Sequence, residues 1–108
     1  MQLRLSKPWI EFTPESVAKV PGQLGVYQLG NDDGNVTYIG YAGGRSLFGL
    51  RSELQQRLPA SGATRFRYEV NMQYLTRYKE LLMLHKADAG TIPILNQAEP
   101  PVRLGRIG

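Results

Sequence analysis

Hydrophobic and polar residues alternate over short stretches near the start of the chain. A strand is predicted at residues 3–5, which residues 9–12 either continue or pair with. Thr13 and Pro14 then mark a helix start, because threonine caps the free N–H groups of a first turn and proline fits its first position. This helix is predicted to be short, since Pro21-Gly22 ends it.

Two stronger strands are predicted at residues 24–29 and 36–42, on either side of the polar stretch 31–35. This pattern is typical of a β-hairpin. The register that we predict sets Tyr27 opposite Tyr38, so that the two phenol hydroxyls lie side by side on one face.

The second half of the chain contains two further helices and one further strand. After a glycine-rich break at 43–46, in which Ser46 can cap a helix, four leucines recur at helical spacing and predict a helix that begins near Leu50. These leucines are Leu47, Leu50, Leu54 and Leu58. Residues 65–72 alternate as a half-buried strand, and an apolar stripe predicts a helix at 74–86, followed by an extended segment.

These elements predict an α+β domain in which helices flank a small three-stranded antiparallel sheet. Residues 1–21 form a strand and short-helix extension packed on the domain, residues 22–96 form the domain, and residues 97–108 form a loosely ordered tail. A chain of 108 residues is long enough for one such core and too short for two.

The composition excludes disulfides and several kinds of metal site. Cysteine is absent, which excludes disulfides and thiolate-bound zinc, and the single histidine, His85, excludes a histidine-clustered metal site. Any metal would be held by oxygen ligands, as magnesium, manganese and calcium are. The first residues lack the apolar stretch of a signal peptide, and no apolar run approaches about 18 residues. We therefore expect a cytoplasmic protein with no membrane partner.

Positive charge is concentrated in the middle of the chain. The net charge is +4, and between residues 42 and 68 Glu53 is the only residue that opposes a set of arginines. These arginines are Arg45, Arg51, Arg57, Arg65 and Arg67. Arginine binds phosphate through a planar fork of donors, so a polyanionic partner is predicted. A merely solvated charged surface is the alternative.

The paired phenols and several later segments resemble the GIY-YIG nuclease superfamily. Gly25-Val26-Tyr27 and Tyr38-Ile39-Gly40 are similar to its two named motifs, and Phe48-Gly49-Leu50-Arg51 is similar to its helix arginine. Glu80-Leu81-Leu82-Met83-Leu84 looks like the apolar helix of the superfamily that carries a glutamate. Pro93-Ile94-Leu95-Asn96 looks like its last motif, an asparagine soon after a proline. The resemblance runs from about residue 22 to residue 96.

The resemblance implies a metal-dependent endonuclease that hydrolyses DNA phosphodiesters. Tyr27 or Tyr38 would accept the proton of the attacking water, and Arg51 would brace the phosphate. Glu80 would hold a divalent cation, Mg²⁺ or Mn²⁺, and Asn96 would orient a neighbouring side chain or backbone. Members of the superfamily commonly carry a separate DNA-reading domain, so a recognition protein, a homodimer or DNA shape would select the target here.

Two positions depart from the pattern of the superfamily. Tyr41 stands where many members have lysine, and Gln55 stands where others have histidine. A second hypothesis is therefore that the chain has the fold of the superfamily but is catalytically inactive, and serves as a nucleic-acid- or protein-binding module. In either hypothesis, Arg45, Tyr41, Arg57, Arg65 and Arg67 are the candidates for contact with nucleic acid.

Simpler interpretations stay open for individual residues. The two phenols could be ordinary half-buried strand aromatics, and Arg51 could be a surface arginine. His85 is expected to be a core residue on a different side of its helix from Glu80. The hydrolase hypothesis requires Tyr27, Tyr38, Arg51 and Glu80 to line one concave patch.

Overall fold

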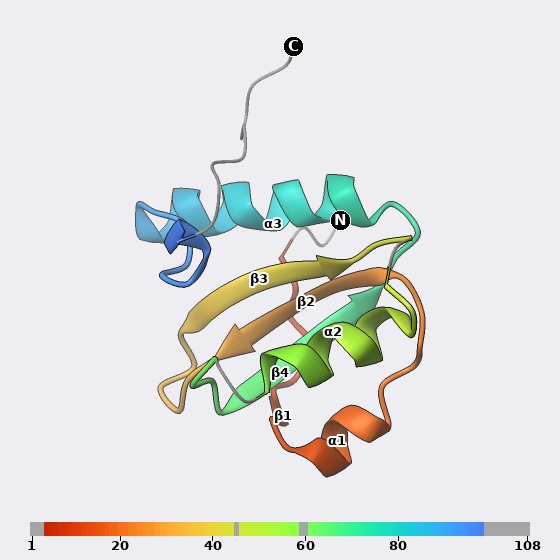
Figure 1. Cartoon of the computed structure of the whole chain (residues 1–108). Helices are drawn as coiled ribbons and strands as arrows, with labels where there is room; N and C mark the ends of the chain where they lie inside the picture. The colour runs from red at the N-terminus through yellow and green to blue at the C-terminus, as the bar shows by residue number, and fades with distance from the viewer. Residues whose placement is uncertain (1–3, 45, 59–60, 99–108) are drawn as a thin grey trace.

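The structure is a computed structural model that describes residues 4–44, 46–58 and 61–98 (Figure 1). The described elements follow in the order β1 (Ile10–Glu11), α1 (Pro14–Ala18), β2 (Gly25–Gly30), β3 (Val36–Ala42), α2 (Gly49–Arg57), β4 (Arg65–Val70), α3 (Tyr74–Ala89) and the 3₁₀-helix η1 (Asn96–Ala98). The α+β class that the sequence predicts is confirmed. Most of the predicted tail lies outside the described residues.

The sheet is antiparallel and has four strands, in the order β1-β4-β2-β3. The predicted count of three is therefore corrected, because the N-terminal segment joins the sheet instead of lying on it. Ile10 pairs with Phe66, and Glu11 pairs with Arg65 at the start of β4. Residues 4–9 contain no strand, so the strand predicted at 3–5 is not found in its described part.

The register of the β2–β3 hairpin differs from the prediction by two residues. Tyr27 lies opposite Gly40, and Leu29 lies opposite Tyr38, with an irregularity at Leu29 and Gly30. Because side chains alternate between faces with a period of two, this shift leaves Tyr27 and Tyr38 on the same face. Their ring centroids are 6.0 Å apart.

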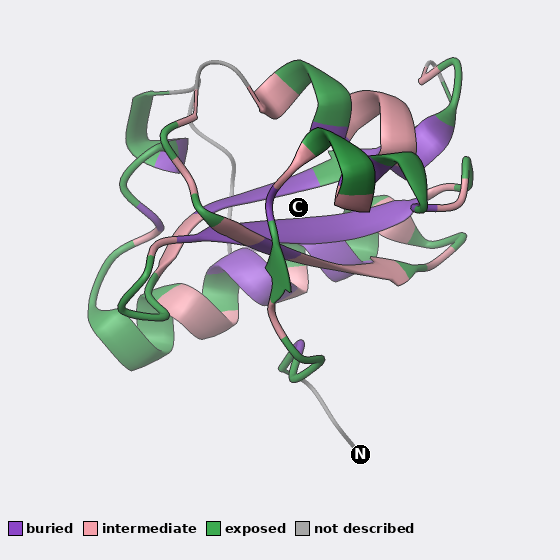
Figure 2. Cartoon of the chain, turned by 90° about the horizontal axis from the view of Figure 1, so that it is seen from below, coloured by how far each residue is buried: buried purple, intermediate pink, exposed green. Residues whose placement is uncertain are grey.

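Helices cover both faces of the sheet, with α1 and α2 on one side and α3 on the other (Figure 1). Beneath α2, Tyr27 and Tyr38 pack with Leu50 and Leu54 in one buried cluster. Beneath α3, a second cluster holds Val26, Ile39, Tyr78, Leu81 and Leu82. Every residue of β2 is buried, and Figure 2 shows this strand in the middle of the molecule.

The helix ends agree with the sequence in part. Thr13 caps α1 as predicted, since its hydroxyl accepts a hydrogen bond from the Ser16 amide at 3.1 Å. Ser46 does not cap α2, because its hydroxyl instead donates to Glu53. The helix α2 begins at Gly49, whose φ of +55° favours glycine. In the described residues no helix is both long and apolar enough to cross a membrane.

Candidate functional site

One guanidinium joins the two tyrosines of the central hairpin. Arg57, at the end of α2, donates from Nε to the Tyr27 hydroxyl at 3.2 Å and from an Nη atom to the Tyr38 hydroxyl at 2.7 Å. The guanidinium carbon also lies 4.4 Å from the centre of the Tyr38 ring. Tyr27 is fully buried and Tyr38 is 5% exposed, whereas Arg57 is half-buried. A cation at the surface is thus held in place by two buried phenols.

Two local features of the sequence build this arrangement. Gly40 faces Tyr27 across the hairpin, and a Cβ at position 40 would lie 2.4 Å from the Tyr27 ring, so glycine leaves the room that the ring needs. On α2, Leu54 is buried against the same cluster as the tyrosines. Arg57 lies three residues after Leu54 and therefore on the same side of the helix.

The resemblance selects Arg51 as the arginine that would brace the phosphate. In the structure Arg51 bonds to the backbone of another segment and not to the two phenols. Its Nε donates to the carbonyl oxygen of Val20 at 2.9 Å and so ties α2 to the end of the α1 segment. Both arginines belong to α2, and the structure assigns the contact with the phenols to Arg57. The sequence predicts Arg57 only as one of the general nucleic-acid contacts.

Glu80 does not join the phenols. It lies on α3, on the opposite side of the sheet, and its carboxylate bonds to the guanidinium of Arg77. Leu82, two residues after Glu80, packs against the sheet. Two residues turn an α-helix by about 200°, so Glu80 projects away from that contact. The prediction that Tyr27, Tyr38 and Glu80 lie together is therefore wrong, because α3 packs on the face of the sheet opposite to the two phenols.

An ion-pair network surrounds Glu80. Arg77 is 8% exposed and donates two further hydrogen bonds, at 2.9 and 3.2 Å, to the carboxylate of Glu69 on β4. Burial raises the pKa of Glu69, but hydrogen bonds from Arg77 and Asn71 and the charges of Arg77 and Lys7 outweigh it and lower that pKa overall. Burial lowers the pKa of Arg77, and its two carboxylate partners reverse the effect and raise it.

The residues present do not fit the divalent cation that the resemblance implies. The Glu80 carboxylate is paired with a guanidinium, and a cation would have to displace that partner. Across the described ranges, no group of three histidine or acidic residues lies close enough to hold a metal ion.

Asn96 holds the outer edge of the hairpin. Its side-chain oxygen accepts a hydrogen bond from the Ile39 amide at 2.8 Å, and its side-chain nitrogen donates to the Ile39 carbonyl at 2.8 Å. Ile39 lies between Tyr38 and Gly40, so Asn96 fixes the backbone of the strand that carries one phenol. The resemblance implies this kind of orienting role.

The remaining predicted contacts with nucleic acid are divided between the faces of the sheet. Tyr41 stacks on the Tyr74 ring of α3, with centroids 5.6 Å apart. Since Phe66 packs beneath α2, its neighbours Arg65 and Arg67 project to the other face. Arg45 lies outside the described residues. The arginine-rich segment therefore does not form a single patch on one face.

His85 also departs from the prediction. Its ring is half-buried and not part of either core cluster, and its Nδ1 lies 2.7 Å from the Thr91 carbonyl oxygen. It contacts the turn that follows α3.

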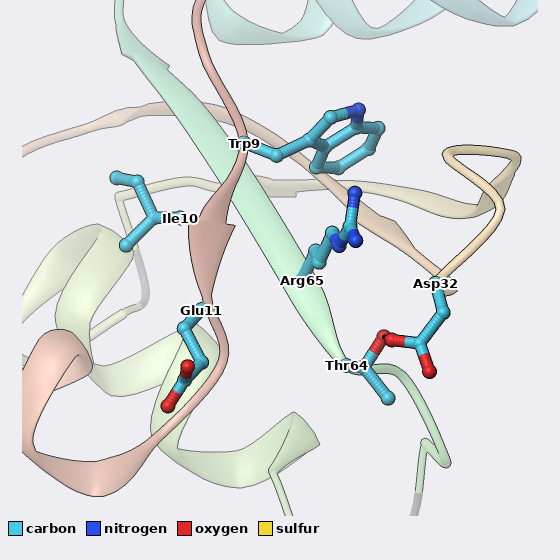
Figure 3. A pocket seen from close by; sticks show the side chains of 6 residues that line it. All are labelled: Trp9, Ile10, Glu11, Asp32, Thr64 and Arg65. Atoms are coloured by element: carbon cyan, nitrogen blue, oxygen red, sulfur yellow. Dashed lines mark hydrogen bonds between the residues drawn. The ribbon is translucent and has the colours of Figure 1, made fainter.

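A pocket of about 390 Å³ lies elsewhere on the molecule, where β1, the β2–β3 turn and the start of β4 meet. It is lined by Trp9, Ile10, Glu11, Asp32, Thr64 and Arg65 (Figure 3). The sequence names Arg65 as a candidate contact but does not reveal the pocket, because the lining residues come from three separate segments that share no spacing. The isolated tryptophan beside a strand was the one available signal.

Comparison with known proteins finds a matching family model. Residues 1–88 match a family model described as a domain of unknown function, DUF7508. No curated protein and no solved structure matches the chain significantly. The matched range begins at the first residue and ends within α3, so it contains the tyrosines, Arg57 and the pocket.

Proposed function

The chain belongs to the DUF7508 family, and we propose that it is a nucleic-acid-binding domain that takes a backbone phosphate at Arg57. The observation that carries this proposal is the pair of hydrogen bonds from one guanidinium to the hydroxyls of Tyr27 and Tyr38. The similarity of the hairpin to the GIY-YIG motifs supports the same class of ligand.

The bonding of Arg57 favours an anion that approaches from solvent. A flexible arginine loses side-chain entropy when it binds a phosphate, and a guanidinium already held by two buried phenols loses less. Arg57 is half-buried, so part of the residue is exposed to solvent. The net charge of +4 adds a long-range attraction for polyanions.

The position of Glu80 favours binding over metal-dependent hydrolysis. Hydrolysis through the predicted residues would need the carboxylate, the phenols and the arginine around one phosphate. Glu80 is instead paired with Arg77 on the other side of the sheet. Under this proposal, a partner protein or a homodimer would select the nucleic-acid target.

Salt-dependent binding tests the proposal, with Arg57→Ala compared with Arg51→Ala as a matched change on the same helix. Removing one phosphate contact should lower the slope of log K against log salt by about 0.9 on duplex DNA, or about 0.7 on single strands. We expect this loss for Arg57→Ala and not for Arg51→Ala. Arg57→Lys, which keeps the charge without the fork, should fall between wild type and Arg57→Ala.

The reverse result would reject the assignment: normal binding by Arg57→Ala, or a loss specific to Arg51→Ala. Urea unfolding of each variant should accompany the titrations, so that weaker binding is compared only among folded proteins.

A DNA endonuclease is the second candidate, and one specific observation favours it. A guanidinium that donates to a phenol oxygen stabilises negative charge there, which a tyrosine acting as a general base requires. Arg57 donates to both phenols.

Incubation of supercoiled, linear and branched DNA with Mg²⁺ or Mn²⁺ separates the two functions. Cleavage that Tyr38→Phe abolishes and Glu80→Gln retains would establish the endonuclease at the phenols. Cleavage that Glu80→Gln abolishes would return Glu80 to the reacting centre and contradict its separation. Binding without cleavage would leave the binding domain as the function.

A further inference from the structure

The pocket beside β1 brings together aromatic, charged and polar side chains. In Figure 3, Trp9, Arg65, Asp32 and Thr64 lie on one side of β1, and Ile10 and Glu11 lie on the other. An aromatic ring, a cation and a hydrogen-bond acceptor therefore share one recess. Its volume of about 390 Å³ falls within the range of small-molecule sites.

We propose that this pocket binds one unpaired guanine nucleotide of a single-stranded nucleic acid, with the base against the Trp9 ring and the phosphate on Arg65. The inference rests on the proposed nucleic-acid binding and adds a second contact, at a site separate from Arg57.

Trp9 is a fixed platform for a base. Its ring lies against the backbone of Gly30, where a Cβ would come within 2.8 Å of the indole. The Arg67 guanidinium lies 4.1 Å from the ring centre and is itself held by Gln28 at 2.8 Å. Because the ring is already packed, stacking a base on it costs little further side-chain entropy.

Arg65 supplies the charge for a phosphate. Within the ranges that the structure describes, its guanidinium has no hydrogen-bond or ion-pair partner, and its side chain is half-buried at the pocket. Figure 3 shows this side chain extending toward Trp9. Arg67, by contrast, is bonded to Gln28 and to the Lys7 carbonyl oxygen. Arg65 is thus available to bind an anion beside the aromatic ring.

Asp32 gives the pocket a preference among bases. The Thr64 hydroxyl donates to its carboxylate at 2.7 Å, which holds the carboxylate at the rim. An ionised carboxylate only accepts hydrogen bonds, so it favours a base edge that carries donors. Guanine presents two adjacent donors on its Watson–Crick edge, whereas thymine presents one. Base pairing in a duplex occupies these donors, so the site requires an unpaired base.

The test uses Trp9 as its reporter, because it is the single tryptophan of the chain. A short guanine-containing single-stranded DNA is titrated into the full-length protein, with tryptophan excited selectively over the tyrosines. We expect saturable quenching of Trp9 fluorescence, weaker quenching with an oligothymidine, and none with the matching duplex. Binding is followed in parallel by the fluorescence anisotropy of a labelled oligonucleotide.

The variants separate the two groups of the pocket. Arg65→Ala should raise the Kd by about fivefold or more, as expected for the loss of a charged contact. Asp32→Asn should reduce the preference for guanine over thymine. Lys19→Ala removes an exposed cation at the end of α1 and should leave both quantities unchanged. Trp9→Ala, followed by anisotropy, should weaken binding by about five- to hundred-fold.

Several results would overturn the pocket assignment: anisotropy that shows binding without quenching, equal quenching by the duplex, or a quenching titration whose Kd Arg65→Ala leaves unchanged. Tighter binding of free guanosine monophosphate than of the oligonucleotide would also overturn it, in favour of a free-nucleotide site.

Arg57→Ala should weaken binding and keep full quenching at saturation. If Arg57→Ala binds normally while Arg65→Ala does not, the Arg57 contact fails and the pocket stands. Absence of all binding rejects both.

Discussion

The Asn96 side chain bonds to both polar atoms of the Ile39 backbone, accepting from the amide and donating to the carbonyl, each at 2.8 Å. Among the described strands, β3 lies at the edge of the sheet, so its outer backbone groups pair with none of the other three. The Leu95 amide adds a third bond, to the Thr37 carbonyl oxygen. The segment after α3 therefore pairs with this edge at the residues next to Tyr38.

Replacing this amide should destabilise the fold. Asn96→Ala leaves the Ile39 amide and carbonyl without their partner in a buried position, which costs about 1–3 kcal/mol. Urea unfolding would measure the loss. Gln97→Ala is the matched control, since Gln97 also bonds the backbone but is exposed, and its loss should be smaller. Equal losses would show that the Ile39 contact contributes nothing beyond an exposed hydrogen bond.

Gly40 is predicted to tolerate no side chain. In Gly40→Ala the new methyl group would lie 2.4 Å from the Tyr27 ring, which must shift within a packed core. We expect a loss of about 1–3 kcal/mol in the free energy of unfolding, measured in urea. At Gly44 the same methyl group would meet nothing within 4 Å, so Gly44→Ala should be nearly neutral. An unchanged unfolding midpoint for Gly40→Ala would contradict the packing of Tyr27 against this strand.

The Arg77 network is predicted to stabilise the fold. Arg77→Met leaves the Glu69 carboxylate without its principal donor, and we expect a loss of about 2–4 kcal/mol in chemical unfolding. Glu80→Gln removes a more exposed partner, whose side chain is 40% accessible, and should cost much less. If the two substitutions cost the same, Glu69 would not be the main partner of Arg77.

Acid should weaken the fold partly through Glu69. Burial alone would raise the pKa of Glu69, but Arg77 and Asn71, with the charge of Lys7, lower it below the unfolded value. A carboxylate of this kind contributes stability that is complete above its unfolded pKa and is lost as the pH falls through its folded pKa. Unfolding free energies across the acid range should therefore fall less steeply for Glu69→Gln than for wild type.

The Arg77→Met background provides the control for this pH dependence. Without the guanidinium, the pKa of Glu69 loses its main cause of lowering, so adding Glu69→Gln should no longer make the acid profile less steep. A steep acid dependence that persists unchanged in Glu69→Gln would assign the effect to other groups.

The sequence by itself determined most elements of the fold. Strand-forming runs on either side of a polar turn located β2 and β3, alternation with a period of two located β4, and helical spacing of apolar residues located α2 and α3, because each pattern is a local property of the chain. The cap at Thr13 was equally local. The strand β1 has two residues, too few to show a period, and it exists because it pairs with β4.

Local sequence patterns predicted only part of the candidate site. The hairpin placed Tyr27 and Tyr38 on one face, since a register error of two residues preserves the face. A helical pattern cannot say which arginine of α2 reaches the phenols, because that depends on how the helix sits on the sheet. Arg57 reaches them, and Arg51 bonds to Val20.

Tertiary structure alone decided where Glu80 lies and what Trp9 contacts. An amphipathic helix can cover either face of a sheet, and the face that α3 covers separates Glu80 from the phenols. The pocket likewise joins Trp9, Asp32 and Arg65 through the pairing of β1 with β4. Local patterns record which side of an element is apolar, whereas contacts between distant segments are set only when those sides pack together.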